Sequence, residues 1–264
     1  MKKGNAKLTF LGTGTSQGVP MIGCGCEVCS SSDSKDKRLR ASVLVETEGA
    51  KILVDAGPDF RQQMLRERIA SVDAILLTHN HKDHTGGLDD IRAFNYHEKR
   101  ATQIYCEKYV EDSLRQEYSY AFAEVKYPGA PEWHVHIIDD QPFEIPSKDG
   151  SETIKIIPIR GRHFKLPVLG YRFGNIAYCT DMNHIADEEF EKLQGLEHFI
   201  INCVRRGRHI SHFSIEQAIA VAEKVGAKHS WLTHLSHQLP CHEELCAELP
   251  PHIRPAYDGL TIEA

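Results

Sequence analysis

The segment His79-Asn80-His81-Lys82-Asp83-His84 constrains this chain more than any other part of its sequence. It places four candidate metal ligands, His79, His81, Asp83 and His84, directly after an apolar run. That run predicts a buried strand, Ala74 to Thr78, which ends in a loop. Alternate side chains of an extended chain point the same way, so we expect His79 and His81 to close on one metal ion and Asp83 and His84 to face a second. Imidazole and carboxylate together suit zinc, manganese, iron or nickel better than calcium or magnesium.

Composition narrows the classes of function. The chain has 264 residues, of which 41% are hydrophobic and 26% charged, and this is ordinary for a soluble globular protein. Its net charge of −6 lowers the expectation of a nucleic-acid partner, because such proteins usually carry a basic surface. The first ten residues lack the apolar run of a secretory signal, and no run approaches the ~18 residues of a membrane span. We therefore expect a cytoplasmic protein with no membrane partner.

Three further strand ends supply candidate ligands. His163 follows the apolar run 154–159, Asp181 follows 176–180 and His234 follows 231–233. The expected arrangement has one ion held by His79, His81 and His163, a second held by Asp83, His84 and His234, and Asp181 bridging both. Asp55 also follows a buried strand, and two interpretations stay open for it. It either accepts a hydrogen bond from a ligand imidazole or begins a turn before Gly57-Pro58.

A separate cysteine cluster predicts a structural zinc site. Cys24, Cys26 and Cys29 offer three thiolates within six residues, and a structural zinc ion requires four ligands. His237 lies three residues after His234, too close to share its ion, and is the best candidate for the fourth ligand. The alternative is three reduced cysteines in a turn. We expect the five scattered cysteines to be free thiols: Cys106, Cys179, Cys203, Cys241 and Cys246.

The chain is expected to form one domain, residues 1–264, because no linker or change of composition divides it. The sequence predicts strands followed by helices, twice over, with mixed pairing and the helices outside. Helices are predicted over 107–125 and 187–194, while residues 126–136 are expected to be a loop rich in Pro and Trp. Ser214 and Gln217 form the pattern of a capping box that begins a helix ending at Gly226.

Together these residues resemble the metallo-β-lactamase superfamily, whose signature stands here as His79-x-His81-x-Asp83-His84, His163, Asp181 and His234. The resemblance implies an α/β fold of four layers, an αββα sandwich with a dinuclear metal site at the edge of the sheets. The segment from Phe10 to Pro20, the cysteine cluster and His234-x-x-His237 are similar to PhnP-type cyclic-phosphate phosphodiesterases. The similarity implies a metal-bridging hydroxide that hydrolyses a small cyclic phosphate or phosphodiester, of the 5-phosphoribosyl 1,2-cyclic phosphate type.

The resemblance also implies a role for His212, which falls where that group has a histidine that contacts the substrate phosphate. His212 would bind phosphate or protonate the leaving oxygen, and the alternative is a structural loop histidine. Asp83 and Asp181 would be catalytic through the metals. The run Arg205-Arg206-Gly207-Arg208 is more basic than expected for that group. Arg205 and Arg208 are the candidates for contacting substrate, and a solvated charge run is the alternative.

Other functions stay open at this point. The same metal site serves thioester or lactam hydrolases and ribonuclease Z-like RNA phosphodiesterases, although no extended basic, glycine-rich arm is found here. A non-catalytic metal-binding module is a further alternative. The expected cofactors are two divalent ions, Zn or Mn, in the active site and one structural Zn. The expected partner is a small phosphorylated substrate, and a homodimer is left open.

Overall fold

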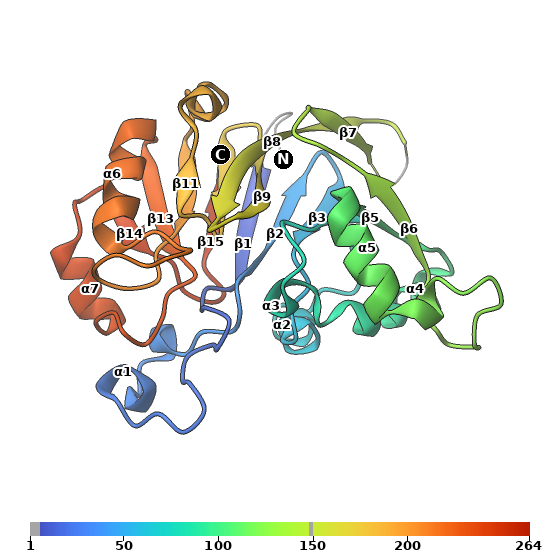
Figure 1. The fold of residues 1–264 in the computed structure, drawn as a ribbon, viewed down its shortest axis with the longest axis horizontal. Helices are drawn as coiled ribbons and strands as arrows, with labels where there is room; N and C mark the ends of the chain where they lie inside the picture. Colours follow the sequence, from blue (N-terminus) through green and yellow to red (C-terminus); the bar gives the residue numbers. More distant parts are fainter. Residues whose placement is uncertain (1–5, 148–149) are drawn as a thin grey trace.

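The computed structural model describes residues 6–147 and 150–264, which form two mixed sheets (Figure 1). The first sheet has the strand order β15-β1-β2-β3-β4-β5-β6. Its strands β1, β2, β3 and β15 pair antiparallel, whereas β3 to β6 pair parallel. The strands are β1 (Ala6–Gly12), β2 (Ser42–Thr47), β3 (Ala50–Val54), β4 (Ala74–Leu76), β5 (Thr102–Cys106), β6 (Trp133–Ile137) and β15 (Thr261–Glu263).

The second sheet has the order β11-β8-β9-β10-β12-β13-β14, with β7 paired to β8. Its antiparallel part comprises β7, β8, β9, β10 and β11, and β10, β12, β13 and β14 run parallel. The strands are β7 (Phe143–Pro146), β8 (Thr153–His163), β9 (Leu166–Phe173), β10 (Ile176–Cys179), β11 (His184–Ile185), β12 (His198–Asn202), β13 (His229–Thr233) and β14 (Ile253–Pro255).

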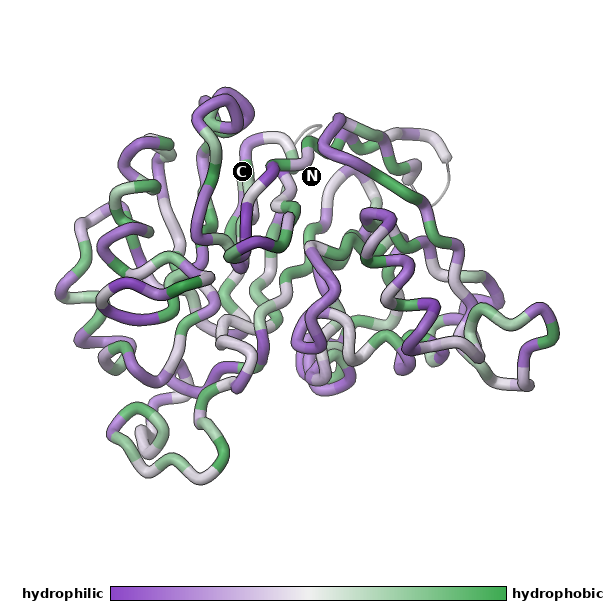
Figure 2. The backbone as a smooth tube through the Cα atoms, viewed as in Figure 1, coloured by the Kyte–Doolittle hydropathy of each residue, from purple (hydrophilic) through white to green (hydrophobic). Residues whose placement is uncertain are grey.

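Helices cover the outer face of each sheet. The first sheet carries α2 (Phe60–Arg66), η2 (Leu88–Ile91), α4 (Arg92–Glu98), α5 (Lys108–Glu117) and η3 (Ser119–Ala121). The second carries η4 (Asp187–Leu193), α6 (Ile215–Val225) and α7 (His242–Glu248). Short helices lie in the loops: α1 (Glu27–Ser30), η1 (Ser34–Asp36) and α3 (Lys82–Thr85). Figure 2 shows hydrophobic and hydrophilic residues alternating along the outer helices, as expected for helices with one buried face.

Side-chain alternation explains why the layers stack as they do. On β3, Ile52 and Val54 point into a core shared with Leu169 and Tyr171 of the other sheet. Leu53 points the opposite way, into a second core with residues of the helices. A strand buried on both faces needs apolar residues at successive positions, because successive side chains point to opposite faces. A third core lies between the second sheet and its helices. The expected α/β fold of helix, sheet, sheet and helix layers is confirmed.

Helix α6 begins and ends as its sequence predicts. The Ser214 hydroxyl accepts a hydrogen bond from Gln217 N, and the Gln217 side chain accepts one from Ser214 N. These two bonds satisfy backbone donors that have no partner inside the helix. Gly226 ends the helix with a φ of 67°, in the left-handed region that favours glycine.

Two expectations about local structure are wrong. Residues 126–136 are not a loop throughout, because β6 begins at Trp133 and pairs with β5 along the edge of the first sheet. The α-helix predicted over 107–125 ends at Glu117 and is followed by the single turn η3. The helix expected over 187–194 is present, as the 3-10 helix η4. Within the described parts of the chain, no helix is both long and apolar enough to cross a membrane.

Candidate dinuclear metal centre

The carboxyl ends of the parallel strands bring the predicted ligands together at one edge of the sandwich. Asp55 directly follows β3, and His79 and His81 follow the neighbouring β4. Asp181 and His234 follow β10 and β13 in the second sheet, and His163 is the last residue of β8. Parallel strands that end at the same level place their loops side by side, so ligands distant in sequence meet here.

Asp181 lies at the centre of two clusters of ligand atoms. Asp83, His84, Asp181 and His234 place one ligand atom each within 4.8 Å of one another. Within this cluster, His84 Nε2 lies 3.2 Å from an oxygen of Asp83 and 3.2 Å from one of Asp181. His234 Nε2 lies 3.1 Å from the other Asp181 oxygen. Asp181 also gathers with His163 and His212 within the same 4.8 Å limit.

The three histidines expected around the other ion form a compact group of rings. The ring centroids of His79 and His81 lie 4.6 Å apart, those of His81 and His163 lie 5.0 Å apart, and those of His79 and His163 lie 5.6 Å apart. His79 is also next to His84 of the other cluster, at 4.3 Å between centroids. The structure therefore brings all seven predicted ligands into one site.

Buried nitrogen atoms in this site test whether metal ions fit it. Nε2 of His79, His84 and His234 is buried, and among the described residues none of these atoms has an aligned hydrogen-bond partner. A buried polar atom left without a partner costs about 1–3 kcal/mol, so several such atoms together need an explanation. Imidazole nitrogens and carboxylate oxygens that face one another are the donor set of a transition-metal site. The residues present therefore fit divalent cations.

Asp55 fixes the orientation of the imidazole ring of His84, one of the candidate metal ligands. Its carboxylate accepts hydrogen bonds from His84 Nδ1 at 2.7 Å and from Thr78 N and Oγ1 at 2.9 Å each. The bond to His84 holds a proton on Nδ1 and leaves Nε2 free to face the cluster, as in many metal sites. Burial raises the pKa of Asp55, while the His84 charge opposes that rise. Of the two interpretations left open for Asp55, the structure shows the hydrogen bond to His84.

Backbone strain accompanies this geometry. Asp55, Asp181 and His234 have φ values of 64°, 56° and 56°, in the left-handed region that costs non-glycine residues free energy. Gly57 allows a close approach next to them, because a Cβ at this position would lie 2.0 Å from the backbone oxygen of Asp83. The loop after β3 thus packs directly against the turn that carries Asp83 and His84.

Burial and neighbouring charges shift the pKa values of the residues in this site. Burial alone would raise the pKa of Asp181, but the positive potential of His234 and His84 outweighs it and holds the pKa well below its usual range. For His84 the balance is opposite, since burial lowers the pKa and the surrounding carboxylates raise it well above its ordinary value. Burial lowers the pKa of His163 to about 4 and that of His79 well below normal. Neutral imidazole is the form that binds metal.

His212 lies on the loop between β12 and α6 and reaches the central carboxylate. Its Nε2 is 3.0 Å from an Asp181 oxygen, and its Nδ1 contacts the Ser211 hydroxyl at 3.1 Å and His209 Nδ1 at 3.2 Å. Burial lowers the pKa of His212, and the hydrogen bond that its ring donates to Asp181 opposes this. The sequence interpretation missed His209. Its spacing of three residues from His212 was the signal available.

The three arginines of the basic run have different environments. Arg206 forms an ion pair with Glu248 of α7. Arg205 and Arg208 instead line a cavity of about 550 Å³ together with His209. Arg205 Nη2 donates to the backbone oxygen of Arg208 at 3.1 Å, which ties the loop to itself.

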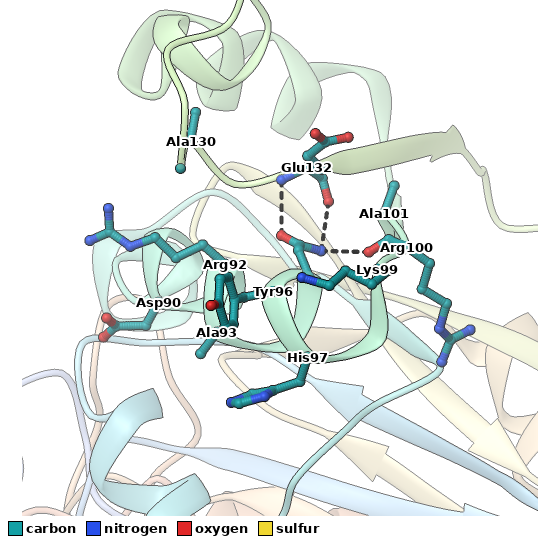
Figure 3. Close-up of a pocket in the computed structure, with 12 residues that line it drawn as sticks. Asp90, Arg92, Ala93, Tyr96, His97, Lys99, Arg100, Ala101, Ala130 and Glu132 are labelled. Carbon is teal, nitrogen blue, oxygen red and sulfur yellow. Dashed lines mark hydrogen bonds between the residues drawn. The ribbon is translucent and has the colours of Figure 1, made fainter.

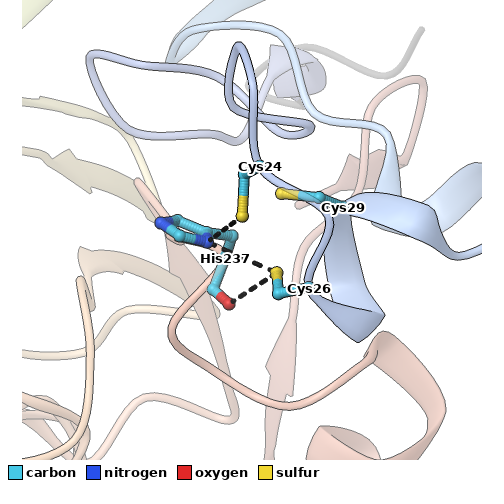
Figure 4. Close-up of side chains that lie close together, drawn as sticks. All are labelled: Cys24, Cys26, Cys29 and His237. Carbon is cyan, nitrogen blue, oxygen red and sulfur yellow. Dashed lines mark hydrogen bonds between the residues drawn. The ribbon is translucent and has the colours of Figure 1, made fainter.

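The predicted cysteine cluster also assembles (Figure 4). Cys24, Cys26, Cys29 and His237 place their ligand atoms within 4.8 Å of one another. The sulfur atoms of Cys24 and Cys26 both lie 3.4 Å from His237 Nδ1. The backbone hydrogen bond at Cys29 and the His237 side chain lower the pKa of Cys26 to about 6, whereas burial raises that of Cys29 to about 11. Three sulfurs and one imidazole match the ligand set of a structural zinc ion.

A cavity of about 770 Å³ lies away from both clusters, against α4 (Figure 3). Its lining includes Arg92, Lys99 and Tyr96, and the Asn95 side chain donates to the backbone oxygens of Arg100 and Glu132. These contacts join α4 to the segment before β6. Among the described residues, none of the metal-ligand clusters lies in this cavity, so the candidate site is the metal centre.

Comparisons with known proteins agree with this geometry. A protein named octanoyltransferase, from Porphyromonas gingivalis, is 46% identical over 254 residues, which cover 95% of this chain but only 50% of that protein. The crystal structure of a new diphosphatase from the PhnP family is 40% identical, with a TM-score of 0.90, and the match covers 98% of this chain and 97% of that one. The short form of human tRNase Z shares the fold, with a TM-score of 0.69 at 18% identity over 97% of this chain and 98% of that one. The family model described as "Beta-lactamase superfamily domain" matches residues 50–235. The chain therefore belongs to the β-lactamase superfamily and has the metal-dependent hydrolase fold of that family.

Proposed function

We propose that this protein is a phosphodiesterase that hydrolyses a small cyclic phosphate or phosphodiester, of the 5-phosphoribosyl 1,2-cyclic phosphate type. The observation that carries the proposal is the central carboxylate of Asp181, which contacts His234, His84 and His212 at once. It thus joins the candidate metal ligands to His212, the histidine that we expect to contact the substrate. Residues 1–264 act as one hydrolase domain in this proposal.

The chain's own residues divide into two ligand groups. His79, His81 and His163 would hold one divalent ion, Asp83, His84 and His234 the other, and Asp181 would contact both. When bound, two zinc or manganese ions supply Lewis-acid charge that lowers the pKa of water and offsets the charge on the phosphate. Asp55 keeps the His84 ring oriented, and the depressed pKa of Asp181 keeps its carboxylate ionised for this role.

The proposed role of His212 is to protonate the leaving oxygen. Hydrolysis adds one water across a phosphorus–oxygen bond: a water oxygen joins phosphorus, and the leaving oxygen keeps the bonding electrons and needs a proton. In this proposal His212 donates that proton, and its support is that His212 Nε2 lies 3.0 Å from Asp181 at the centre of the site. A bound phosphate anion favours the protonated imidazole and so counters the lowering of its pKa by burial.

The names of similar proteins support phosphoryl chemistry but do not agree with one another. The PhnP-family diphosphatase matches nearly the whole chain, and its name states phosphate chemistry. The octanoyltransferase is a protein twice as long as the matched region, so its name describes more than the shared half. Thioester or lactam hydrolysis is therefore the alternative to test, together with ribonuclease Z-like cleavage of RNA.

The cysteine cluster completes the proposal as a structural zinc site formed by Cys24, Cys26, Cys29 and His237. His237 lies three residues after His234, so this zinc would anchor the loop that carries one ligand of the active site. Leu235 N donates to Thr13 O at 2.8 Å, and Thr15 N donates to Leu235 O at 3.2 Å. These bonds join the same loop to the N-terminal turn.

A substrate panel tests the proposed function. The purified metal-loaded protein is assayed with bis(p-nitrophenyl) phosphate, a nucleoside 2′,3′-cyclic phosphate, a glutathione thioester, a β-lactam and a precursor tRNA. We expect turnover of the phosphodiesters, with His212→Ala retaining its metal content but losing rate. Turnover of only the thioester, the lactam or the tRNA would select that alternative. Loss of metal from His212→Ala would show that His212 is a ligand instead.

A further inference from the structure

We infer that Asn202 is a positioning residue of the metal centre, and that its buried amide sets the place of two candidate ligands, Asp181 and His163. The inference rests on the metal centre of the proposed function and names a residue of that site that is not itself among the ligands. Asn202 is the last residue of β12 and is fully buried. Its strand lies between β10 and β13, which end shortly before Asp181 and His234.

The side chain of Asn202 continues the hydrogen bonding of the sheet where a strand has ended. The pairing of β10 with β12 stops at Cys179 and Ile201, and Met182 lies outside the strands. Met182 N donates to Asn202 Oδ1 at 2.8 Å, and Asn202 Nδ2 donates to Met182 O at 2.9 Å. A primary amide offers a donor and an acceptor side by side, as the backbone of a neighbouring strand would. Both backbone groups of Met182 are therefore bonded to one side chain.

The turn held in this way carries the central carboxylate. Asp181 directly precedes Met182 and has a φ of 56°, a conformation that persists for a non-glycine residue only where its surroundings hold it. Thr180 Oγ1 donates to Asp181 Oδ2 at 2.7 Å, which fixes the carboxylate group. The two bonds of Asn202 fix the backbone behind that group.

The same turn orients a second ligand. His163 Nδ1 donates to the backbone oxygen of Asp181 at 3.1 Å, so its Nε2 is the nitrogen left for a metal ion. The Met182 side chain packs against Gly161 on β8, where a Cβ would lie 2.4 Å from Met182 Sδ. The backbone oxygen of Met182 also accepts a bond from Phe213 N at 2.8 Å, which joins the turn to the loop after β12. A shift of the turn would therefore move both ligands.

Such a shift should affect the two proposed ions unequally. Asp181 would contact both ions, whereas His163 belongs to the group with His79 and His81. The ion of that group depends on the turn through two ligands, and the other ion depends on it through one. Loss of the partner that orients a ligand typically weakens metal binding by roughly 10–100-fold. We expect a loss of this size for the first ion and a smaller loss for the second.

Titration of the metal-free protein with cobalt(II) tests the inference without turnover. The visible absorption of bound cobalt reports its ligand geometry, and the binding steps give the affinity of each ion. Asn202→Ala should weaken one step by roughly 10–100-fold, weaken the other less and change the visible spectrum of the loaded protein. Gly161→Ala should give the same pattern, because its Cβ would displace Met182 from the β8 side.

Two controls separate positioning from a general loss of stability. Asn95→Ala is the matched variant, because Asn95 also joins backbone groups, donating to Arg100 O and Glu132 O and accepting from Glu132 N, at the far edge of the first sheet. It should keep both cobalt affinities and the visible spectrum. The near-ultraviolet absorption of cobalt bound to thiolate reports the cysteine cluster and should be the same in every variant.

The outcomes separate the inference from the proposed function. Wild-type cobalt affinities and spectra in Asn202→Ala and Gly161→Ala would overturn the inference, and so would an equal loss of affinity in Asn95→Ala. If Asn202→Ala does not fold, Gly161→Ala decides. Failure of the wild type to hydrolyse any phosphodiester would overturn the proposed function, and the cobalt titration would still decide the role of Asn202. A wild type that binds cobalt only at the cysteine cluster would overturn both.

Discussion

Replacing Asp55 with Asn tests how the hydrogen bond between Asp55 and the candidate ligand His84 controls metal affinity. The variant keeps the shape of the side chain, and Asn tolerates the left-handed backbone that Asp55 adopts at a φ of 64°. Its amide oxygen can still accept from Thr78 N. Its NH₂ group, however, would face His84 Nδ1, where the carboxylate now accepts a hydrogen bond at 2.7 Å. His84 must then move its proton to Nε2, the nitrogen that faces the cluster.

The size of the effect follows from that tautomer change. Loss of an acceptor behind a ligating histidine typically weakens metal binding 10–100-fold, which is about 1.4–2.7 kcal/mol. The fold itself should lose less, about 1 kcal/mol, since one hydrogen bond is weakened while the buried atoms of Thr78 keep a partner. The expected signature is therefore a large loss of metal affinity with a small loss of stability.

Competition with a chromogenic chelator measures the affinity, and urea unfolding of the chelated protein measures the stability. Asp258→Asn is the matched control, because Asp258 is also buried and accepts hydrogen bonds from Thr13, Leu39 and Arg66 outside the metal centre. It should lower stability without changing metal affinity. Unchanged metal affinity in Asp55→Asn would refute the reasoning.

Three further predictions follow from local geometry. Gly57→Ala should lower the free energy of unfolding by about 1–3 kcal/mol and weaken metal binding, because its Cβ would lie 2.0 Å from Asp83 O. Gly25→Ala has open space around it and should change stability less. Equal urea midpoints for the two variants would contradict this prediction. In the zinc-depleted protein, iodoacetamide should modify Cys26 with a half-maximal rate near pH 6, because its lowered pKa makes the thiolate dominant above that pH; a midpoint near that of an ordinary thiol would refute it. Ser214→Ala should lower the free energy of unfolding in urea by about 1 kcal/mol, because the N-cap of α6 is lost, and Ser214→Thr should retain most of that stability. Equal stability of the wild type and both variants would show that the cap does not stabilise the protein.

The sequence predicted the parts of the fold in which local and tertiary preferences agree. The strand before His79 is short, apolar and buried on both faces, and α6 combines an apolar face with a capping box and a terminal glycine. At such positions, local conformation and burial favour the same structure. The grouping of seven ligands could be anticipated because each one follows an apolar run, and strand ends converge at one edge.

The remaining differences depend on contacts that sequence spacing does not contain. The strand β6 lies in the stretch expected to be a loop. It has exposed residues on both of its faces, so its sequence lacks the pattern of a half-buried strand, and its pairing with β5 holds it in place. His209 takes its place through a contact with His212 on the loop after β12. Asn183, which follows β10, is held by hydrogen bonds with the backbone of Phe164 and Ile210. The run of three arginines looks uniform in sequence, and only the position of Glu248 on α7 distinguishes Arg206 from the other two.

Elemental analysis of the purified, unchelated protein tests the central claim most directly. We expect about three metal ions per chain: two lost together in Asp181→Ala, and one zinc lost separately in Cys26→Ser. Each loss should leave the other site filled. Detection of the thiolate-bound zinc alone, with a histidine and aspartate cluster that takes up no added divalent ion, would contradict the account.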